Sequence, residues 1–228
     1  MDDYIIVSFE AKIHPINLMP LQSNFSKIRG SQWKFLPFVP IIGLVAYVLL
    51  FVVAAGKYGG SQDVYTWTEH LFCDLMKQFS SSGFENGART IAIIGNTFLF
   101  IGMAVFFYIL PSKFKSYNWR LKTVQILGVT SMSIFLFLFS VHHDTVVLIS
   151  GILGTVLVYL LIKEYYFQFT IQKSGFAIFC LMLSIVFFLL YQFRLWEDYL
   201  PIVQRTAFVL DSSWVALTCL SIAKDIRV

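Results

Sequence analysis

Charged residues are scarce in this sequence, and their scarcity argues against most kinds of soluble protein. Asp, Glu, Lys and Arg make up 13% of the 228 residues, whereas hydrophobic residues make up 57%. Soluble domains hold about 45 to 50% apolar residues. A soluble domain of this size cannot bury such an excess of long apolar side chains. The composition therefore predicts side chains that face a lipid bilayer.

Cysteine pairs and the common catalytic signatures are also lacking. The three cysteines, Cys73, Cys180 and Cys219, form no C-x-x-C pair, so we expect no disulfide framework. The sequence contains no H-E-x-x-H motif, no glycine-rich phosphate loop and no nucleophile elbow. We also expect no removable signal peptide in the first 34 residues. The few ionisable residues are therefore the candidates for chemistry.

Long apolar runs are what the sequence does contain. A helix needs about 20 apolar residues to cross a bilayer core of about 30 Å. Six runs approach that length: 35–55, 90–110, 123–141, 145–162, 174–193 and 202–223. Strands of a membrane barrel alternate apolar and polar residues, whereas these runs are apolar at odd and even positions alike, which excludes such strands. We predict an all-α polytopic membrane protein, a six-transmembrane-helix bundle without a second domain.

The basic residues predict how this bundle is oriented. Of the 17 Lys and Arg residues, twelve fall on the side of both termini, and five fall on the other: Lys57, Lys77, Arg89, Arg194 and Arg205. Basic residues concentrate on the cytoplasmic side of membrane proteins. We therefore expect both termini in the cytoplasm, with the protein in a plasma membrane of the bacterial inner-membrane type. The net charge of +4 then needs no nucleic-acid partner.

This topology divides the chain into three parts. Residues 1–34 form a cytoplasmic segment that lies partly on the membrane surface, 35–223 form the transmembrane domain, and 224–228 form a cytoplasmic tail. The only long connection is the outer loop 56–89, in which apolar residues recur every three or four positions from 64 to 79. That spacing predicts an amphipathic helix over 64–79 on the outer face of the bundle.

Histidine and aspartate gather on the outer side. His70 and Asp74 stand four residues apart, and His142, His143 and Asp144 form the turn between the third and fourth runs. Imidazole and carboxylate groups are the ligands of catalytic zinc. One interpretation is a metal site, with the three histidines as ligands and the two aspartates as catalytic carboxylates. The other is a polar surface of the kind that any outer turn needs.

Asp211 lies near the centre of the sixth run, where a charged side chain costs at least about 2.5 kcal/mol. It shares a stripe with Gln204 and Thr218 at intervals of seven residues, so we expect it to face the bundle interior. Two roles are equally open for it. It is a third catalytic carboxylate at the floor of an outward-facing pocket, or it orders the bundle by hydrogen bonding or by pairing with Arg89 or Arg205.

Several short motifs resemble those of a known group of proteins. They are Cys73-Asp74-Leu75, Asn86-Gly87-x-Arg89, a second run with Gly95 and Gly102, Leu110-Pro111, and His142-x-Asp144. Over roughly residues 60–160 the chain resembles small six-span bacterial membrane proteins of unknown function, distantly similar to the DRAM-like group of eukaryotes. This resemblance implies six helices and cytoplasmic termini but no reaction.

A second similarity is to the ceramidase-like superfamily of membrane zinc hydrolases. Ser140 and His142 correspond to the Ser and His of one span in those enzymes, and Asp74 or Asp211 corresponds to their carboxylate. The similarity implies hydrolysis of a lipid amide. The later His-x-x-x-His pair of that superfamily has no counterpart in the fifth and sixth runs.

Two functions follow from these patterns, and a third is weaker. The leading hypothesis is a polar His/Asp pocket that binds a membrane lipid or a small molecule, or a subunit of a membrane complex with protein partners. The alternative is a zinc-dependent hydrolase acting on a lipid amide or ester at the outer leaflet. A proton-coupled transporter using Asp211 would need broken helices or an inverted repeat, and the sequence shows neither.

Overall fold

The computed structural model describes residues 34–59 and 64–227, and the regular secondary structure of that part is helical apart from one isolated β-bridge. Six α-helices occur there: α2 (Phe38–Ala55), α3 (Arg89–Ile109), α4 (Trp119–Phe135), α5 (His143–Gln168), α6 (Ile171–Gln192) and α7 (Leu200–Arg227). Three short 3-10 helices accompany them: η2 (Phe72–Met76), η3 (Leu110–Lys113) and η4 (Glu197–Tyr199). The predicted all-α class is confirmed for these residues.

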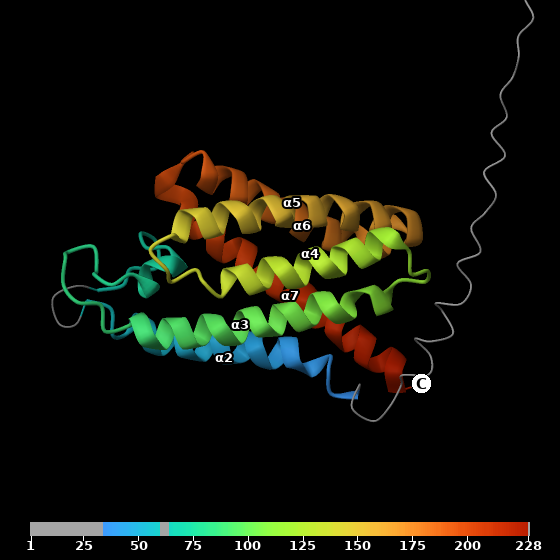
Figure 1. Cartoon of the computed structure of the whole chain (residues 1–228), viewed down its shortest axis with the longest axis horizontal. Helices are drawn as coiled ribbons and strands as arrows, with labels where there is room; N and C mark the ends of the chain where they lie inside the picture. The colour runs from blue at the N-terminus through green and yellow to red at the C-terminus, as the bar shows by residue number, and fades with distance from the viewer. Residues whose placement is uncertain (1–33, 60–63, 228) are drawn as a thin grey trace, which may run out of the picture. The chain divides into compact units, whose positions relative to one another are not determined.

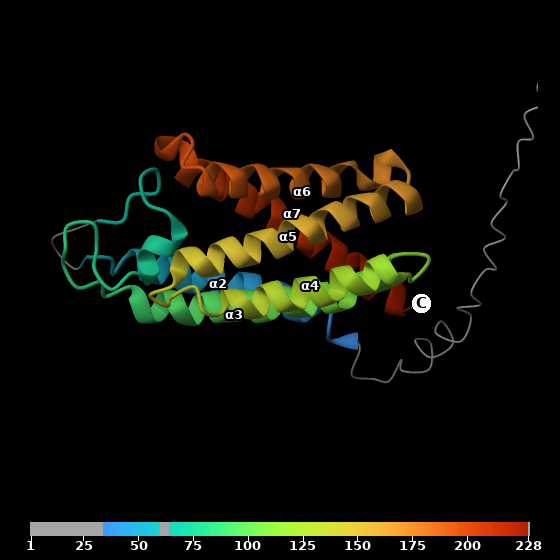
Figure 2. The ribbon, with the colours of Figure 1, turned by 45° about the horizontal axis from the view of Figure 1, so that its top comes forward.

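The six α-helices form a closed ring. Each helix packs against the next along the chain, and α7 also packs against α2. Successive helices run in opposite directions, and α7 lies obliquely across the others (Figures 1 and 2). Residues 56–59, 64–88, 136–142 and 193–199 come together at what we call the loop end of the bundle. The α3–α4 and α5–α6 connections and the end of α7 lie at the opposite end.

Five of the described helices, α2, α3, α5, α6 and α7, are long and apolar enough to cross a membrane. Only about a third of the side chains in the apolar part of α2 are buried, and Ile42, Leu49 and Val52 are each more than half exposed. A water-soluble bundle would carry polar side chains on such a face. The outer faces of these helices therefore suit lipid, which is consistent with a membrane protein.

The third run forms a shorter helix than its apolarity predicts. Helix α4 has 17 residues and ends at Phe135, whereas the run continues to residue 141. Beyond Phe135 the backbone bonds shift to three-residue spacing, with the N–H of Leu138 donating to the carbonyl of Phe135 at 3.0 Å. Apolar composition indicates that a segment prefers lipid, but it does not indicate the residue at which the α-helix ends and a turn begins.

The helix expected over 64–79 forms only in part. The structure has a turn at 67–69 and then the five-residue helix η2. The backbone of this segment bonds to side chains of α7, and such contacts override the local preference for an α-helix. Most of the expected surface segment 1–34 lies outside the described residues, and α7 continues through the expected tail as far as Arg227.

One buried ion pair joins α4 to α5 near the opposite end. Glu164 of α5 is 1% exposed. Its carboxylate accepts hydrogen bonds from Nη1 of Arg120 at 3.2 Å and from Nδ2 of Asn118 at 3.0 Å. A buried charge is tolerated when it is paired and hydrogen-bonded. The contact therefore fixes the start of α4 against the end of α5.

Candidate functional site

The loop between α2 and α3 is held in place by the first turns of α7. The backbone N–H of Phe72 donates to Oε1 of Gln204 at 2.8 Å. Nη2 of Arg205 donates to the carbonyl of His70 at 2.8 Å and to the hydroxyl of Tyr65 at 3.0 Å. Burial raises the pKa of Tyr65 in spite of the neighbouring guanidinium, so its hydroxyl stays protonated and can donate. Two adjacent residues of α7 thus determine the path of this loop.

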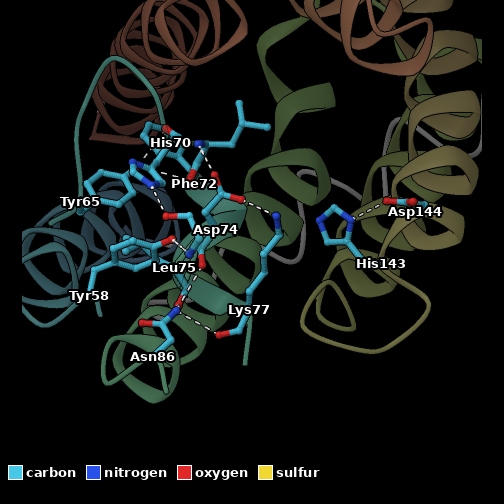
Figure 3. Close-up of polar contacts among 12 residues, drawn as sticks. Tyr58, Tyr65, His70, Phe72, Asp74, Leu75, Lys77, Asn86, His143 and Asp144 are labelled. Atoms are coloured by element: carbon cyan, nitrogen blue, oxygen red, sulfur yellow. Dashed lines mark hydrogen bonds and ion pairs between the residues drawn. The ribbon is translucent and has the colours of Figure 1, made fainter. Parts of the chain in front are cut away.

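Asn86 and Asp74 shape the loop around η2 (Figure 3). Nδ2 of Asn86 lies within 3.2 Å of the carbonyl oxygens of Asp74, Leu75 and Lys77. One carboxylate oxygen of Asp74 accepts the N–H of Leu71 at 2.6 Å, and the other pairs with Nζ of Lys77 at 2.7 Å. Partial burial tends to lower the pKa of Lys77, but the bonded Asp74 outweighs it, and the net pKa is raised. The Lys77 ammonium therefore stays charged at neutral pH.

A pocket of about 440 Å³ opens at the loop end. Its walls come from the α2–α3 loop, the first turn of α5, the end of α6 and the start of α7. We call it the loop-end pocket. Four carboxylates and two basic groups line it: Glu69, Asp74, Asp144, Glu197, Lys77 and Arg194. Its formal charge is negative, and both signs are present in a space of small-molecule size.

Arg194 stands at the rim of this pocket in an unusual backbone conformation. Its φ is +51°, and the N–H of the next residue, Leu195, donates back to the carbonyl of Leu190 at 2.9 Å to close helix α6. Glycine normally occupies this position, and another residue there costs about 1 to 2 kcal/mol. Strain of this kind gathers at functional sites. Neither the Arg194 guanidinium nor the Glu197 carboxylate forms an ion pair within the described chain, so both are available to a ligand.

The structure brings together two of the predicted carboxylates. Asp74 and Asp144 lie 70 positions apart in the sequence, and both line the loop-end pocket. Asp144 lies in the first turn of α5, where a negative charge is favourable, and accepts a contact of 3.0 Å from Nδ1 of His143. The two aspartates therefore line one pocket. Asp74 lies on the short helix η2 and Asp144 in the first turn of α5, whereas the sequence predicted a long surface helix for Asp74.

The histidines do not line the pocket. Nδ1 of His70 lies 2.9 Å from the hydroxyl of Thr66, and its Nε2 lies 3.4 Å from the hydroxyl of Ser81. The ring also packs edge-on against Tyr58. His70 therefore serves to hold the loop together.

His142 and His143 lie at the start of α5, on a different element from His70. His142 is exposed, and His143 is drawn well apart from His70 in Figure 3. In residues 34–59 and 64–227 no group of three or more His, Cys, Asp or Glu side chains is placed to hold a metal ion. The zinc site expected from these histidines is thus not assembled there. The expectation relied on His70 and Asp74 sharing a helical face, but the chain is not helical at His70 and Leu71, and the 3-10 helix η2 begins only at Phe72.

Asp211 faces α6. Its carboxylate accepts a hydrogen bond of 2.7 Å from the hydroxyl of Ser184, and neither Arg89 nor Arg205 pairs with it. It is not part of the loop-end pocket. It lies 11 residues beyond Leu200 on α7, which is about 16 Å along a helix. Of the two roles expected for Asp211, the structure supports interhelical hydrogen bonding and not the pocket floor.

The α6–α7 turn is a part of the site that the sequence did not predict. Arg194 and Glu197 both line the pocket, and neither forms an ion pair within the described chain. The signal was present in the sequence, because a basic and an acidic residue three positions apart lie between the fifth and sixth apolar runs, on the same side as the long loop.

A comparison with protein families, with curated proteins and with solved structures finds no match for the chain. Function is therefore inferred from the pocket itself.

Proposed function

We propose that this chain is a six-span protein of the plasma membrane with both termini in the cytoplasm. Its loop-end pocket opens outward and binds the headgroup of a phospholipid that carries a primary amine. The observation that carries the proposal is the pocket's charge pattern, in which an excess of carboxylates stands beside two basic groups. An ammonium group suits the carboxylates, and a phosphate suits Arg194 and Lys77.

The packing of α4 supports a sixth span. Its 17 residues are about 26 Å long, close to the thickness of a bilayer core, and the turns up to residue 139 extend it. It packs along its length between α3 and α5, both of which are long enough to cross. A helix that did not cross would have to leave the bilayer between two neighbours that do.

The distribution of basic residues supports the orientation. Of the 14 Lys and Arg residues in the described part of the chain, the loop end carries five and the opposite end nine. Exposed aromatic side chains beside the pocket, Trp196 and Tyr199, suit the interface between lipid and water. A phospholipid headgroup in the pocket would place its chains next to these residues.

The size of the pocket supports a headgroup as its ligand. Pockets for small molecules span about 300 to 1,000 Å³, and the loop-end pocket has about 440 Å³. That volume is sufficient for an ethanolamine phosphate, while the acyl chains would remain along the apolar faces of the helices. Lys77 is already engaged by Asp74, so Arg194 is the principal candidate for the phosphate and Glu197 for the amine.

The test is the binding of phosphatidylethanolamine to the detergent-solubilised full chain, measured by native mass spectrometry. We expect Glu197→Gln and Arg194→Gln each to weaken binding about tenfold, because a hydrogen bond between charged groups contributes about 1.5 to 3 kcal/mol. Asp198→Asn is the matched control, since Asp198 is the exposed neighbour that does not line the pocket. Equal affinity in all four proteins, or equal binding of phosphatidylcholine, would reject the amine assignment.

A further inference from the structure

A second and larger pocket lies at the opposite end of the bundle. Its volume is about 660 Å³, and its walls come from η3 and the residues after it, the end of α5, the start of α6 and the last part of α7. We call it the opposite-end pocket. It is separate from the loop-end pocket and shares no residue with it.

The charge of the opposite-end pocket is the reverse of the first. Two lysines, Lys113 and Lys115, line it, and no Asp or Glu is among the described residues of its wall. Hydroxyl groups of Thr170, Thr218 and Ser221 add hydrogen-bonding capacity. A ligand with a negative charge and several acceptor oxygens would complement this rim.

The remainder of the opposite-end pocket is apolar. Phe169, Phe176, Trp214 and Leu217 line it, and Leu217 is 60% exposed on the outer side of α7. The cavity therefore has basic groups at one part of its wall and apolar side chains at the other, which continues into the apolar outer surface of the bundle. A ligand that fits both parts has an anionic head and an aliphatic tail.

We propose that the opposite-end pocket binds an anionic phospholipid. Its phosphate contacts Lys113, Lys115 and Ser221, and an acyl chain runs past Phe176 and Leu217. Basic pockets between membrane helices are a recurrent form of site for acidic lipids. This site goes beyond the proposed function of the loop-end pocket, because its residues, ligand charge and membrane leaflet all differ.

An ion pair partly occupies the basic rim. Nζ of Lys113 donates to the hydroxyl of Ser221 and also pairs with the carboxylate of Asp225 at 3.3 Å. The Asp225 side chain is 62% exposed and does not line the pocket. A lipid phosphate must therefore compete with Asp225 for Lys113. Removing that carboxylate should strengthen binding, which is the opposite of what a general loss of stability would cause.

The experiment is native mass spectrometry of the full chain in detergent with phosphatidylglycerol and, separately, phosphatidylcholine. Lys115→Gln should weaken phosphatidylglycerol binding about fivefold, since a basic residue near an acidic lipid contributes about 1 kcal/mol. The double variant K113Q/K115Q should weaken it further. Asp225→Asn should bind more tightly than the unmodified chain. The control is K122Q/K163Q, which removes two exposed lysines from the same end outside the pocket.

Three outcomes would overturn the proposal. Equal losses in K113Q/K115Q and K122Q/K163Q would mean that the lipid responds only to overall surface charge. Equal binding of phosphatidylglycerol and phosphatidylcholine would mean that the site does not distinguish an anionic headgroup from a zwitterionic one. Displacement of the lipid by inorganic phosphate at equal concentration would assign the rim to a free anion. None of these outcomes bears on Glu197 or Arg194, so the two proposals fail or stand separately.

Discussion

Glu164 shows how a single residue can tie two helices together. Its carboxylate is buried, whereas the side chain of its partner Arg120 is about one-third exposed. Removing Arg120 leaves a buried charge with only amide partners, and loss of one member of such a pair costs about 3 kcal/mol or more. Glu164→Gln instead leaves an arginine that can reach water and keeps an acceptor for Asn118. It should cost about 1 kcal/mol.

We therefore expect Arg120→Gln to lower the thermal unfolding midpoint in detergent by more than Glu164→Gln does. Lys122→Gln is the control, because Lys122 is an exposed basic residue on the same helix. If Arg120→Gln melted at the same temperature as Lys122→Gln, the buried pair would not stabilise the contact between α4 and α5.

Cys73 offers a test by pH at the loop end. Burial, reinforced by the neighbouring Asp74 carboxylate, raises the pKa of the Cys73 thiol to about 12 from its usual 9.0. Only the thiolate reacts with alkylating reagents, so a raised pKa keeps the reactive form rare. At pH 8 the alkylation rate of Cys73 should be lower than that of an ordinary cysteine by at least about a hundredfold, since each pKa unit is tenfold.

The pH profile of this reaction distinguishes the raised pKa from simple shielding. With iodoacetamide and peptide mapping, the rate at Cys73 should continue to rise tenfold per pH unit beyond pH 9 in the folded protein. The same cysteine in the denatured chain has its usual pKa of 9.0, so half of its thiol is ionised at pH 9, and its rate should level off above about pH 10. A plateau above about pH 10 in the folded protein, as in the denatured chain, would show that shielding alone slows the reaction.

At the scale of elements, the packing of α2 against α3 depends on small residues. A methyl group on Gly43 would lie 2.6 Å from the carbonyl oxygen of Phe98 and 3.3 Å from the Cα of Gly102. Backbone atoms cannot move aside as a flexible side chain can, so the two helices would have to separate. Small residues at such positions let membrane helices approach closely.

Gly43→Ala should therefore destabilise the protein by about 1 to 3 kcal/mol, the usual cost of overpacking. Gly154→Ala is a matched control, since a methyl group there meets no atom within 4 Å and alanine favours the helix. The comparison is made by denaturant unfolding in the same detergent. Equal stability of the two variants would contradict the close contact between α2 and α3.

The elements were predictable from the sequence to different degrees. Each of the six apolar runs overlaps one α-helix, although α4 ends before its run does, because burial in lipid and helical hydrogen bonding both favour long apolar segments. The segment 64–79 was predicted less well, since its apolar spacing suggested an α-helix. Its backbone instead bonds to Gln204 and Arg205, which lie more than 130 positions away in sequence. No local pattern records such contacts.

At the scale of the whole site, the sequence predicted part of the loop-end pocket. The alternation of apolar runs placed Asp74 and Asp144 on one side of the bundle, and both line the pocket. The contribution of Arg194 depends on its left-handed backbone conformation, which a sequence does not display. Asp211 was placed correctly within its helix, but its partner depends on how α6 faces α7. Which side of one helix faces another is determined by packing over the whole bundle.

The proposed topology is a six-span bundle whose loop end faces outward. The most direct measurement is labelling of single cysteines by a membrane-impermeant maleimide in intact cells, in a chain whose native cysteines are replaced. Val141→Cys is a suitable probe because Val141 is 95% exposed in the connection between α4 and α5, and Lys122→Cys probes the start of α4 at the opposite end. We expect labelling of Val141→Cys in intact cells and of Lys122→Cys only after permeabilisation. Labelling of Lys122→Cys in intact cells, or the same behaviour at both positions, would contradict it.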